Sequence, residues 1–298
     1  MVDYLRLEKC IVKLYFLAKL KISHISICAS KNVNNYFIFQ TVDLVQPDLT
    51  NFIWALGLIA VAIGLSVWEK LGLEWSLAVA TGRTILQLVA VGFVLEVVFA
   101  EPNPGIMVVV LAVMLIIATR VANSRIGKKI PWLLPIVSAS LMISTILTLA
   151  YVNFLVVQIP TWYEPQYLIP FAGIVLGNAM NGAAIAGERL SSILTSSRLE
   201  IDTHLSLGAS SQQAVAQYRK DAIKAAMIPN INTMMVVGVV TLPGTLTGQL
   251  LSGINPFTAA FYQMLILFMQ AFASLLTTVL VTRGICQQAF NSAEQLKI

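Results

Sequence analysis

The run from Ala225 to Thr282 contains no charged residue. A transmembrane helix needs about 20 apolar residues, so this run is too long for a single crossing of a bilayer. The Ser-Gly-Ile-Asn-Pro stretch at Ser252–Pro256 has the composition of a break between two helices. The run therefore predicts two transmembrane spans, Pro229–Leu251 and Phe257–Val281.

The rest of the chain is similarly apolar, because 57% of all residues are hydrophobic and only 11% are charged. Such a composition is not that of a water-soluble domain. It predicts an all-α, polytopic membrane protein of about seven transmembrane helices. The five further spans that we expect are Asn51–Trp68, Ser76–Phe99, Gly105–Thr119, Trp132–Val157 and Tyr167–Gly187.

Three parts are expected along the chain. Residues 47–287 form the transmembrane domain, with a loop at 188–224, and residues 288–298 form a polar C-terminal tail. Residues 1–46 mix lysines, apolar residues and asparagines without a steady period or a signal-peptide cleavage site. Three interpretations of this extension stay open: a peripheral amphipathic anchor, a poorly ordered segment, or translation begun upstream of the true start.

Lysine and arginine are distributed unevenly among the loops between the predicted spans. Alternate loops, together with the C-terminal end, carry thirteen basic residues, whereas the remaining loops, 100–104, 158–166 and 252–256, carry none. Basic loops stay on the cytoplasmic side of a membrane. We therefore expect the loop at Glu188–Lys224 and the C-terminus to be cytosolic, in a multi-pass protein of the plasma or inner membrane. The net charge of +5 is assigned to these loops and not to nucleic-acid binding.

The fifth predicted span has polar and small residues in a regular pattern. Asn178, Asn181, Ile185 and Glu188 fall on one helical stripe. This stripe predicts either hydrogen bonds between helices or the lining of a polar path. Gly173 and Gly177 are spaced as GxxxG, and Gly182 and Ala186 repeat the small-xxx-small spacing, which predicts close helix contacts.

The second and sixth predicted spans supply further candidates for a translocation path. Pro243 and Gly244 must break or kink a helix, and freed carbonyl groups inside a membrane are tolerated where they line a cavity or are packed by protein. The candidate path residues are Gln87, Asn178, Asn181, Asn232, Pro243 and Gly244.

Several classes of activity lack their sequence patterns. There is no HExxH motif, no nucleophile elbow and no GxxxxGK[ST] phosphate-binding loop. Cys10, Cys28 and Cys286 are scattered and do not pair with His24 or His204. We therefore expect a transport subunit and not an enzyme, with no cofactor in this chain and no metal-ligand set that can be named. A proton-driven carrier usually has Asp, Glu or His in the middle of its spans. The last three predicted spans of this chain contain none of these residues at mid-span.

Three segments resemble one family. LGNAMNGAAIAGERL, LSLGAS and IPNINTMMVVGVVTLPGTLTGQLLSG are similar to the FetB-type iron-export ABC permeases, which include the plant aluminium-tolerance membrane subunits. The resemblance extends from about Pro47 to Arg283 and implies a permease that pairs with a separate ATP-binding subunit, as two copies of each. LSLGAS resembles the coupling loop of ABC importers, although Asp202-Thr203-His204 stands where those proteins have Glu-Ala-Ala.

The resemblance implies that ATP is bound by the partner and that this chain contributes the coupling residues Glu188, Arg189, Leu207, Gly208, Ala209 and Ser210. The predicted function is the permease subunit of an ABC transporter, exporting iron or another metal ion. The predicted partners are the ATP-binding subunit, a second copy of the permease and membrane lipid. The alternatives are a stand-alone channel or carrier, an ABC permease for a non-metal substrate such as a nucleotide sugar, and a structural scaffold.

Overall fold

Long apolar runs form helices here because a helix satisfies its own backbone hydrogen bonds where water is absent. The computed structural model describes residues 49–100, 103–127, 130, 132–158, 161–291 and 295–296, and these contain helices and no β-strand, only two isolated bridges. They belong to one compact unit, Val42–Ile298. The interpretations of residues 1–46 lie outside the described residues. The fold is the predicted one, all-α and polytopic.

Five helices in the described part of the chain are long and apolar enough to cross a membrane. They are α3 (Glu74–Ala100), α4 (Pro104–Ile126), α5 with the π-helical segment η1 (Leu133–Val157), α6 (Pro165–Ser196) and α11 (Pro256–Ala289). α2 spans Leu49–Trp68, and its part Phe52–Trp68 is a shorter apolar helix. The first five predicted spans and the seventh each correspond to one of these helices.

α6 and α11 are longer than the spans predicted for them. α6 has 32 residues and α11 has 34, which correspond to about 48 and 51 Å at 1.5 Å per residue, against about 30 Å of hydrocarbon. The predicted loop at 188–224 is helical at its start, because α6 continues for about two more turns beyond Glu188 to Ser196. A charged residue ends a membrane-embedded stretch, but it does not end a helix.

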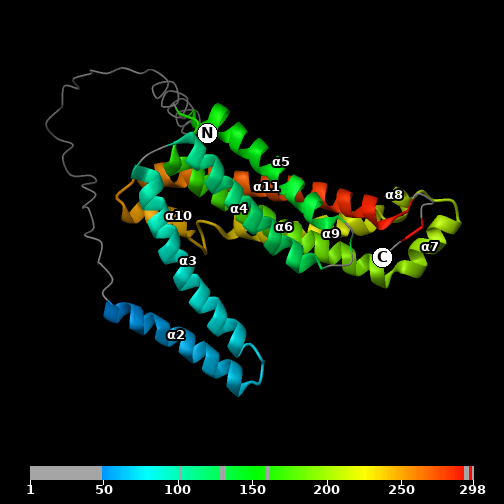
Figure 1. Ribbon diagram of the computed structural model, residues 1–298, viewed down its shortest axis with the longest axis horizontal. Coiled ribbons are helices and arrows are strands. Elements are labelled where there is room, and N and C mark those ends of the chain that lie inside the picture. The colour runs from blue at the N-terminus through cyan, green and yellow to red at the C-terminus, as the bar shows by residue number, and fades with distance from the viewer. Residues whose placement is uncertain are drawn as a thin grey trace, which may run out of the picture. The chain divides into compact units, whose positions relative to one another are not determined.

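α6 lies at the centre of the helix packing. It contacts α4, α5, α9 (Ala216–Val236) and α11, and α11 also packs against α5 and α9. Figure 1 shows α4, α5, α6 and α11 running side by side. Small residues on α6 permit this, because a Cβ atom added to Gly187 would lie 2.6 Å from Ile126 Cδ1 and one added to Gly182 would lie 3.2 Å from Thr278 Cγ2.

The close contacts predicted for the fifth span are therefore found at Gly182. Gly177, by contrast, faces open space, because no atom of the described residues lies within 4 Å of a Cβ added there. Of the GxxxG pair, Gly173 has a described neighbour, because a Cβ added there would lie 3.4 Å from Met114 Cε of α4, an ordinary van der Waals contact.

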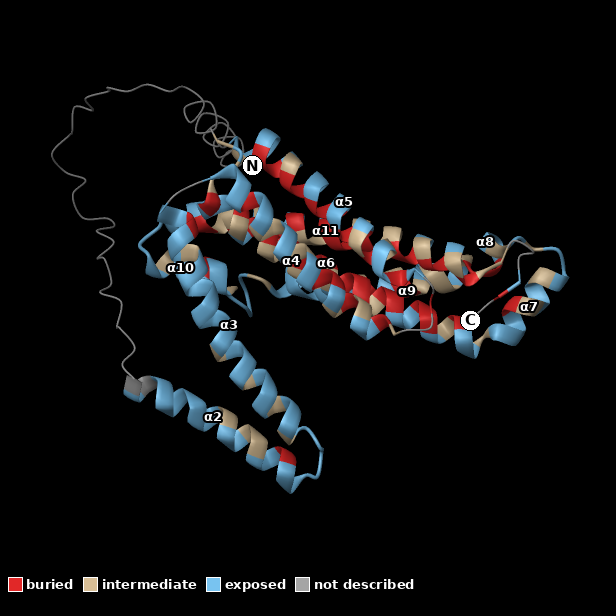
Figure 2. Cartoon of the chain, viewed as in Figure 1, coloured by how far each residue is buried: buried red, intermediate tan, exposed pale blue. Residues whose placement is uncertain are grey.

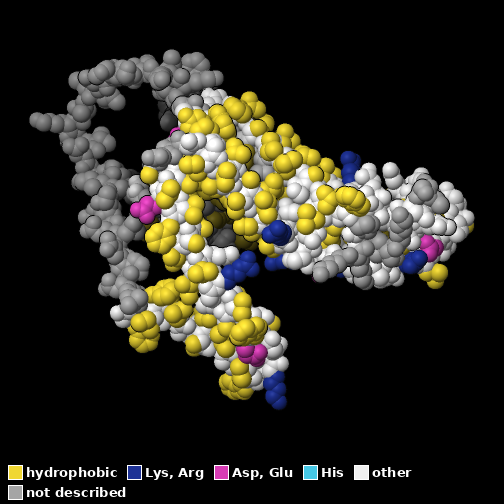
Figure 3. Space-filling model, viewed as in Figure 1, with side chains coloured by type: hydrophobic (Ala, Val, Ile, Leu, Met, Phe, Trp, Pro, Cys, Tyr) yellow, Lys and Arg dark blue, Asp and Glu magenta, His cyan; other side chains and the backbone are white. Residues whose placement is uncertain are grey.

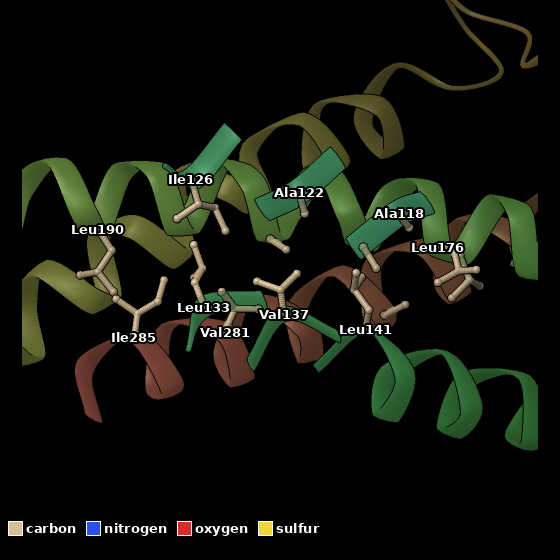
Figure 4. Close-up of a cluster of buried hydrophobic side chains, with 14 of the residues drawn as sticks. Ala118, Ala122, Ile126, Leu133, Val137, Leu141, Leu176, Leu190, Val281 and Ile285 are labelled. Atoms are coloured by element: carbon tan, nitrogen blue, oxygen red, sulfur yellow. The ribbon is translucent and has the colours of Figure 1, made fainter. Parts of the chain in front are cut away.

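Most of the hydrophobic core comes from the four helices α4, α5, α6 and α11. Figure 4 shows Ala118, Ala122 and Ile126 of α4 facing Leu133, Val137 and Leu141 of α5, with side chains of α6 and α11 closing the cluster. Complete burial of a Val or Leu side chain contributes about 1.5–3 kcal/mol in water, although in lipid close packing replaces much of that driving force.

Serine and threonine side chains line the contact between α5 and α11. The Thr277 hydroxyl donates to Ser144 Oγ at 2.6 Å, and both residues are fully buried. Other hydroxyls of this seam, including those of Thr148 and Thr282, donate to carbonyls of their own helix. The seam attaches α11 to α5 by a polar contact between residues 133 positions apart.

The sixth predicted span is broken. α9 runs unbroken through Pro229 to Val236, residues 237–243 are non-helical, and α10 (Gly244–Leu251) follows. The predicted break at Pro243 and Gly244 is confirmed, but it begins earlier, at Val237. Within the predicted span Pro229–Leu251 the chain turns before the proline is reached, because Gly238 has φ +80°.

The surface differs between regions of the bundle. Buried residues form stripes along α5, α6 and α11, whereas α2 and α3 are almost entirely exposed (Figure 2). Hydrophobic side chains cover the membrane-spanning helices in Figure 3, while the end that carries α7 (Arg198–Ser206) and α8 (Ser211–Ala214) shows few of them. This distribution is that of a bundle surrounded by lipid with one polar end.

Candidate coupling elbow and path residues

The polar end of the bundle is an elbow made of α7, Leu207–Ser210 and α8. It begins at Ser197, the residue between the end of α6 and the start of α7. The Ser197 N–H donates to Ile193 O at 2.8 Å. Ile201 on the inner side of α7 is fully buried, as is Leu194 at the end of α6. The buried side chains of Ala214 and Val215 belong to the same hydrophobic cluster, so the elbow has a packed base.

Gly208 closes α7 with a complete Schellman motif. Its N–H donates to Leu205 O at 3.0 Å, and the N–H of Ala209 donates to His204 O at 3.1 Å, which is the paired bonding pattern of that cap. The motif needs a left-handed residue, and Gly208 has φ +89°. No described atom lies within 4 Å of a Cβ added there, so the requirement for glycine is conformational and not steric.

Ser210 opens α8 with a reciprocal capping box. The Gln213 N–H donates to Ser210 Oγ at 3.4 Å, and the Ser210 N–H donates to Gln213 Oε1 at 3.0 Å. The segment LSLGASSQQ is thus a helix stop followed at once by a helix start. The Ser-x-x-Gln spacing is a sequence signature of a helix N-terminus that was not among our predictions.

The C-terminal residues also brace the elbow. α11 extends to Ala289, beyond the predicted start of the tail at residue 288, and Leu296 is buried within the main hydrophobic cluster. Arg198 of α7 donates to Leu296 O at 3.4 Å. The Gln295 N–H donates to Asn291 Oδ1 at 2.8 Å. The predicted polar tail is therefore, in its described part, packed against α7.

α9 is tied to α7 through Tyr218. Burial, and then a hydrogen bond to the Glu200 side chain, raise the pKa of Tyr218 above its ordinary value of 10.0. The neutral phenol is therefore the form that stabilises this contact. Its contribution is fully present at neutral pH and is lost only as the pH rises through the raised pKa.

The elbow also presents two apolar side chains to solvent. Leu199 is 82% exposed and Leu207 is 80% exposed, at the start and the end of α7. Leu199 was not among the predicted coupling residues. These two side chains are candidates for an apolar contact with another protein.

The six predicted coupling residues fall into two groups. Leu207, Gly208, Ala209 and Ser210 form the tip of the elbow, as expected. Glu188 and Arg189 lie on α6, about two turns before its end, and are exposed there. Glu188 lines a separate pocket with Ile126 and Gly127, where α4 ends, so the structure does not bring it together with the elbow tip.

The predicted path residues on α6 have partners. Asn178 donates from Nδ2 to Ile174 O, one turn earlier, at 3.0 Å. Asn181 Oδ1 accepts a hydrogen bond from Arg125 Nη1 of α4 at 3.4 Å. Asn181 therefore makes a hydrogen bond between two helices, which is one of the two roles predicted for this stripe. Asn178 is half-buried and Asn181 is exposed.

The other path residues lie on different helices. Gln87 is exposed on α3, 11 residues or about 16 Å before Val98, the residue of that helix that is buried. Asn232 is exposed on α9, and Pro243 and Gly244 form the start of α10. These residues are not gathered into one site within the described part of a single chain.

A cavity of about 520 Å³ lies between α6, α10 and α11. Tyr167 and Ile174 line it from α6, Gly244 and Gly248 from α10, and Tyr262 from α11. Beside it the Thr245 hydroxyl donates to Gln263 Oε1 at 2.5 Å, and Gln263 is only 5% exposed. A glutamine in an apolar span is a sequence signal for such an anchor, and Gln263 was not among the predicted site residues.

No metal-ligand cluster is found in the described part of the chain, where no three His, Cys, Asp or Glu side chains gather. The polar groups that face the cavity between α6, α10 and α11 are hydroxyls and amides, which are neutral.

Comparison with known proteins identifies the family. The model of an uncharacterised protein family, UPF0014, matches residues 49–290. The chain belongs to the UPF0014 family. Residues 49–290 include every helix described above, from α2 to α11. No solved structure matches the chain significantly.

The relatives within UPF0014 are membrane proteins of bacteria and plants. A UPF0014 membrane protein of Synechocystis, slr1647, is 47% identical over 86% of this chain and 98% of its own length. The probable iron export permease protein FetB of Escherichia coli is 32% identical over 82% of this chain and 93% of its own. The protein ALUMINUM SENSITIVE 3 of Arabidopsis thaliana is 29% identical over 82% and 88%. The resemblance stated from the sequence is confirmed.

Proposed function

We propose that this chain is the membrane subunit of an ABC transporter and that a separate ATP-binding subunit docks on the elbow. The observation that carries the proposal is the pair of exposed leucines, Leu199 and Leu207, on a polar end that is firmly packed beneath them. A soluble motor subunit needs such a site outside the membrane, and the chain has no phosphate-binding loop of its own.

Two helices connect the elbow to the membrane bundle and could carry a movement between them. α6 enters the elbow and α9 leaves it, and each also forms part of the membrane bundle. A movement of the elbow would therefore be transmitted along two helices without passing through a flexible linker. We assign Leu207–Ser210 to the contact with the motor, and α6, α9 and α10 to the path.

The cargo that we propose is iron or another metal ion, moved outward across the plasma or inner membrane with the elbow in the cytosol. Support comes from the relative named as a probable iron export permease, 32% identical to this chain. A nucleotide sugar or another non-metal substrate is the alternative, and transport assays with both classes of cargo distinguish them.

The docking site is tested by adding charge to the elbow. We expect ATPase activity to co-purify with the affinity-tagged chain from native membranes, and Leu199→Asp or Leu207→Asp to remove most of it, because a carboxylate cannot be buried in an apolar contact without a partner. Ser192→Asp is the matched control, since Ser192 is exposed on α6 but lines the separate pocket with Glu188.

Two results would oppose the proposal. One is the absence of ATPase activity in the wild-type preparation, and the other is cargo flux through liposomes that contain this chain alone. The second result would identify a stand-alone channel or carrier. Absence of flux under every condition, with or without the ATPase, would identify a scaffold.

A further inference from the structure

The break between α9 and α10 is exposed on the surface of the single chain. Val239 is 89% exposed, Val240 is 76% exposed and Leu242 is 60% exposed. The last six residues of α9, Ile231–Val236, are exposed as well. Something outside the described part of the chain must therefore surround a stretch that includes non-helical backbone.

The break lies at membrane depth. Lys224 is the last charged residue of α9, and Val237 follows it by 13 residues, or about 20 Å along the helix axis. The hydrocarbon layer is about 30 Å thick, so the break lies well inside it. A soluble partner that docks on the elbow cannot cover this depth.

The backbone of the break is only half satisfied. The N–H groups of Val239, Val240 and Thr241 all point to one oxygen, Val236 O, and the N–H of Gly238 donates to Thr241 O at 2.9 Å. The carbonyl oxygens of Gly238, Val239 and Val240 accept no hydrogen bond from any described residue. Lipid tails cannot supply one, and irregular backbone that faces lipid is not found inside membranes.

Water alone fits the side chains poorly, because the same stretch exposes valine, leucine and methionine. Met235 is 75% exposed beside the break. A protein surface that combines apolar contact with hydrogen-bond donors would satisfy both the side chains and the carbonyls.

This chain itself has such a surface. The first N–H groups of α10, at Gly244 and Thr245, have no partner within a helix because they begin one. Asn232 is exposed on α9 and carries an amide. Donors and acceptors therefore lie within one apolar patch, and a patch that complements itself can pair with its own copy about a two-fold axis.

We infer that the α9–α10 break, residues 237–243, is the membrane-embedded contact between two copies of this chain, with each copy's break covering the other's. The inference rests on the pairing of two permease copies in the proposed transporter.

Cysteine cross-linking in native membranes tests the contact. The full chain is first prepared with Cys10, Cys28 and Cys286 replaced by Ser, and Val239→Cys or Val240→Cys is then introduced. Oxidation or a short bismaleimide is expected to produce a covalent dimer for at least one of these two variants. The matched control is Ile146→Cys on α5, which is 60% exposed and apolar but lies on an unbroken helix. It is expected to stay monomeric on denaturing gels.

Maleimide accessibility supplies the opposing result. If neither variant cross-links and the thiol of the Val239→Cys variant is labelled readily by a membrane-soluble maleimide or by an impermeant one, lipid or open water covers the break and the inference fails. Native mass measurement separates the two proposals. A dimer without a cross-link at the break overturns the inference alone, whereas a monomer with no associated ATPase overturns the proposed transporter as well.

Discussion

At the residue scale, Gly187 permits a close helix contact because its side chain is a single hydrogen atom. Its α-hydrogen faces Ile126, and any larger side chain would meet Ile126 Cδ1 at 2.6 Å. Gly284 on α11 is in the same position against Ile136 of α5. Both glycines hold a neighbouring helix close, so they determine where α4 and α5 lie relative to α6 and α11.

Gly187→Ala is expected to destabilise the protein by about 1–3 kcal/mol, the usual cost of overpacking. Its matched control is Gly177→Ala on the same helix, which faces open space and is expected to be neutral or slightly stabilising. Unfolding midpoints of the two variants in the same detergent provide the comparison. Equal midpoints would contradict the close contact with Ile126.

Gly208 makes a different demand, because its surroundings are empty and only its backbone angle is unusual. Gly208→Ala should weaken the elbow by about 1 kcal/mol, since an L-residue is strained in the left-handed region. Gly208→Asn should lose less, because asparagine tolerates that region. Amide hydrogen exchange at Leu205–Ala209 measures the difference. Exchange that is unchanged in the alanine variant would show that the cap is not needed.

Gly208→Trp adds bulk at the tip and should uncouple transport without preventing insertion into the membrane.

At the scale of single elements, α10 is a short helix with few described anchors. It is eight residues long, and its described anchors are the Thr245–Gln263 hydrogen bond and the buried side chain of Leu246. Gly238 turns the chain before it and Gly253, with φ +78°, turns the chain after it. α10 is therefore a short helix held on one side, facing a cavity on α6.

Thr245→Val should destabilise the protein by about 1 kcal/mol, because it leaves the buried Gln263 amide without its hydroxyl donor. The double variant Thr245→Val/Gln263→Leu should recover most of that loss, since no unpaired polar group remains. A double-mutant cycle on unfolding midpoints gives the coupling. Additive effects would show that the two side chains do not interact.

The limits of prediction from sequence are clearest for these elements. The spans were predictable because apolar length alone determines them, and the break was predictable from Pro243. Its start was not, because only the φ of Gly238 shows that the chain turns there. The fifth span was predicted to end at Gly187 because the charged Glu188 follows it, whereas α6 continues to Ser196 as one helix with Leu190 and Leu194 buried. The Ser144–Thr277 bond joins positions 133 residues apart, and no local pattern predicts such a pair.

On the scale of the whole molecule, the bundle has a polar end and an opposite end whose loops carry no basic residue. The elbow, the end of α11 and the described part of the tail lie together at the polar end, while the loops without basic residues lie at the opposite ends of the membrane helices. From the positive-inside rule we expect the elbow to lie in the cytosol.

This orientation is tested by labelling single cysteines in the variant without native cysteines. Leu199→Cys on the elbow should react with an impermeant maleimide only after permeabilisation, because it is expected to be cytosolic. Ile254→Cys, in the loop between α10 and α11, should react on intact cells. The reverse pattern would place the proposed motor on the wrong side of the membrane.

The Schellman cap at Gly208 and the capping box at Ser210 have a kinetic consequence. Because these bonds form within the elbow, its shape exists before any partner arrives, and little conformational entropy is lost when the two meet. Encounters with a preformed surface need no folding step, so association is limited by orientation and dissociation by the few apolar anchors. The motor could then detach and return between transport cycles without the elbow ever having to be rebuilt.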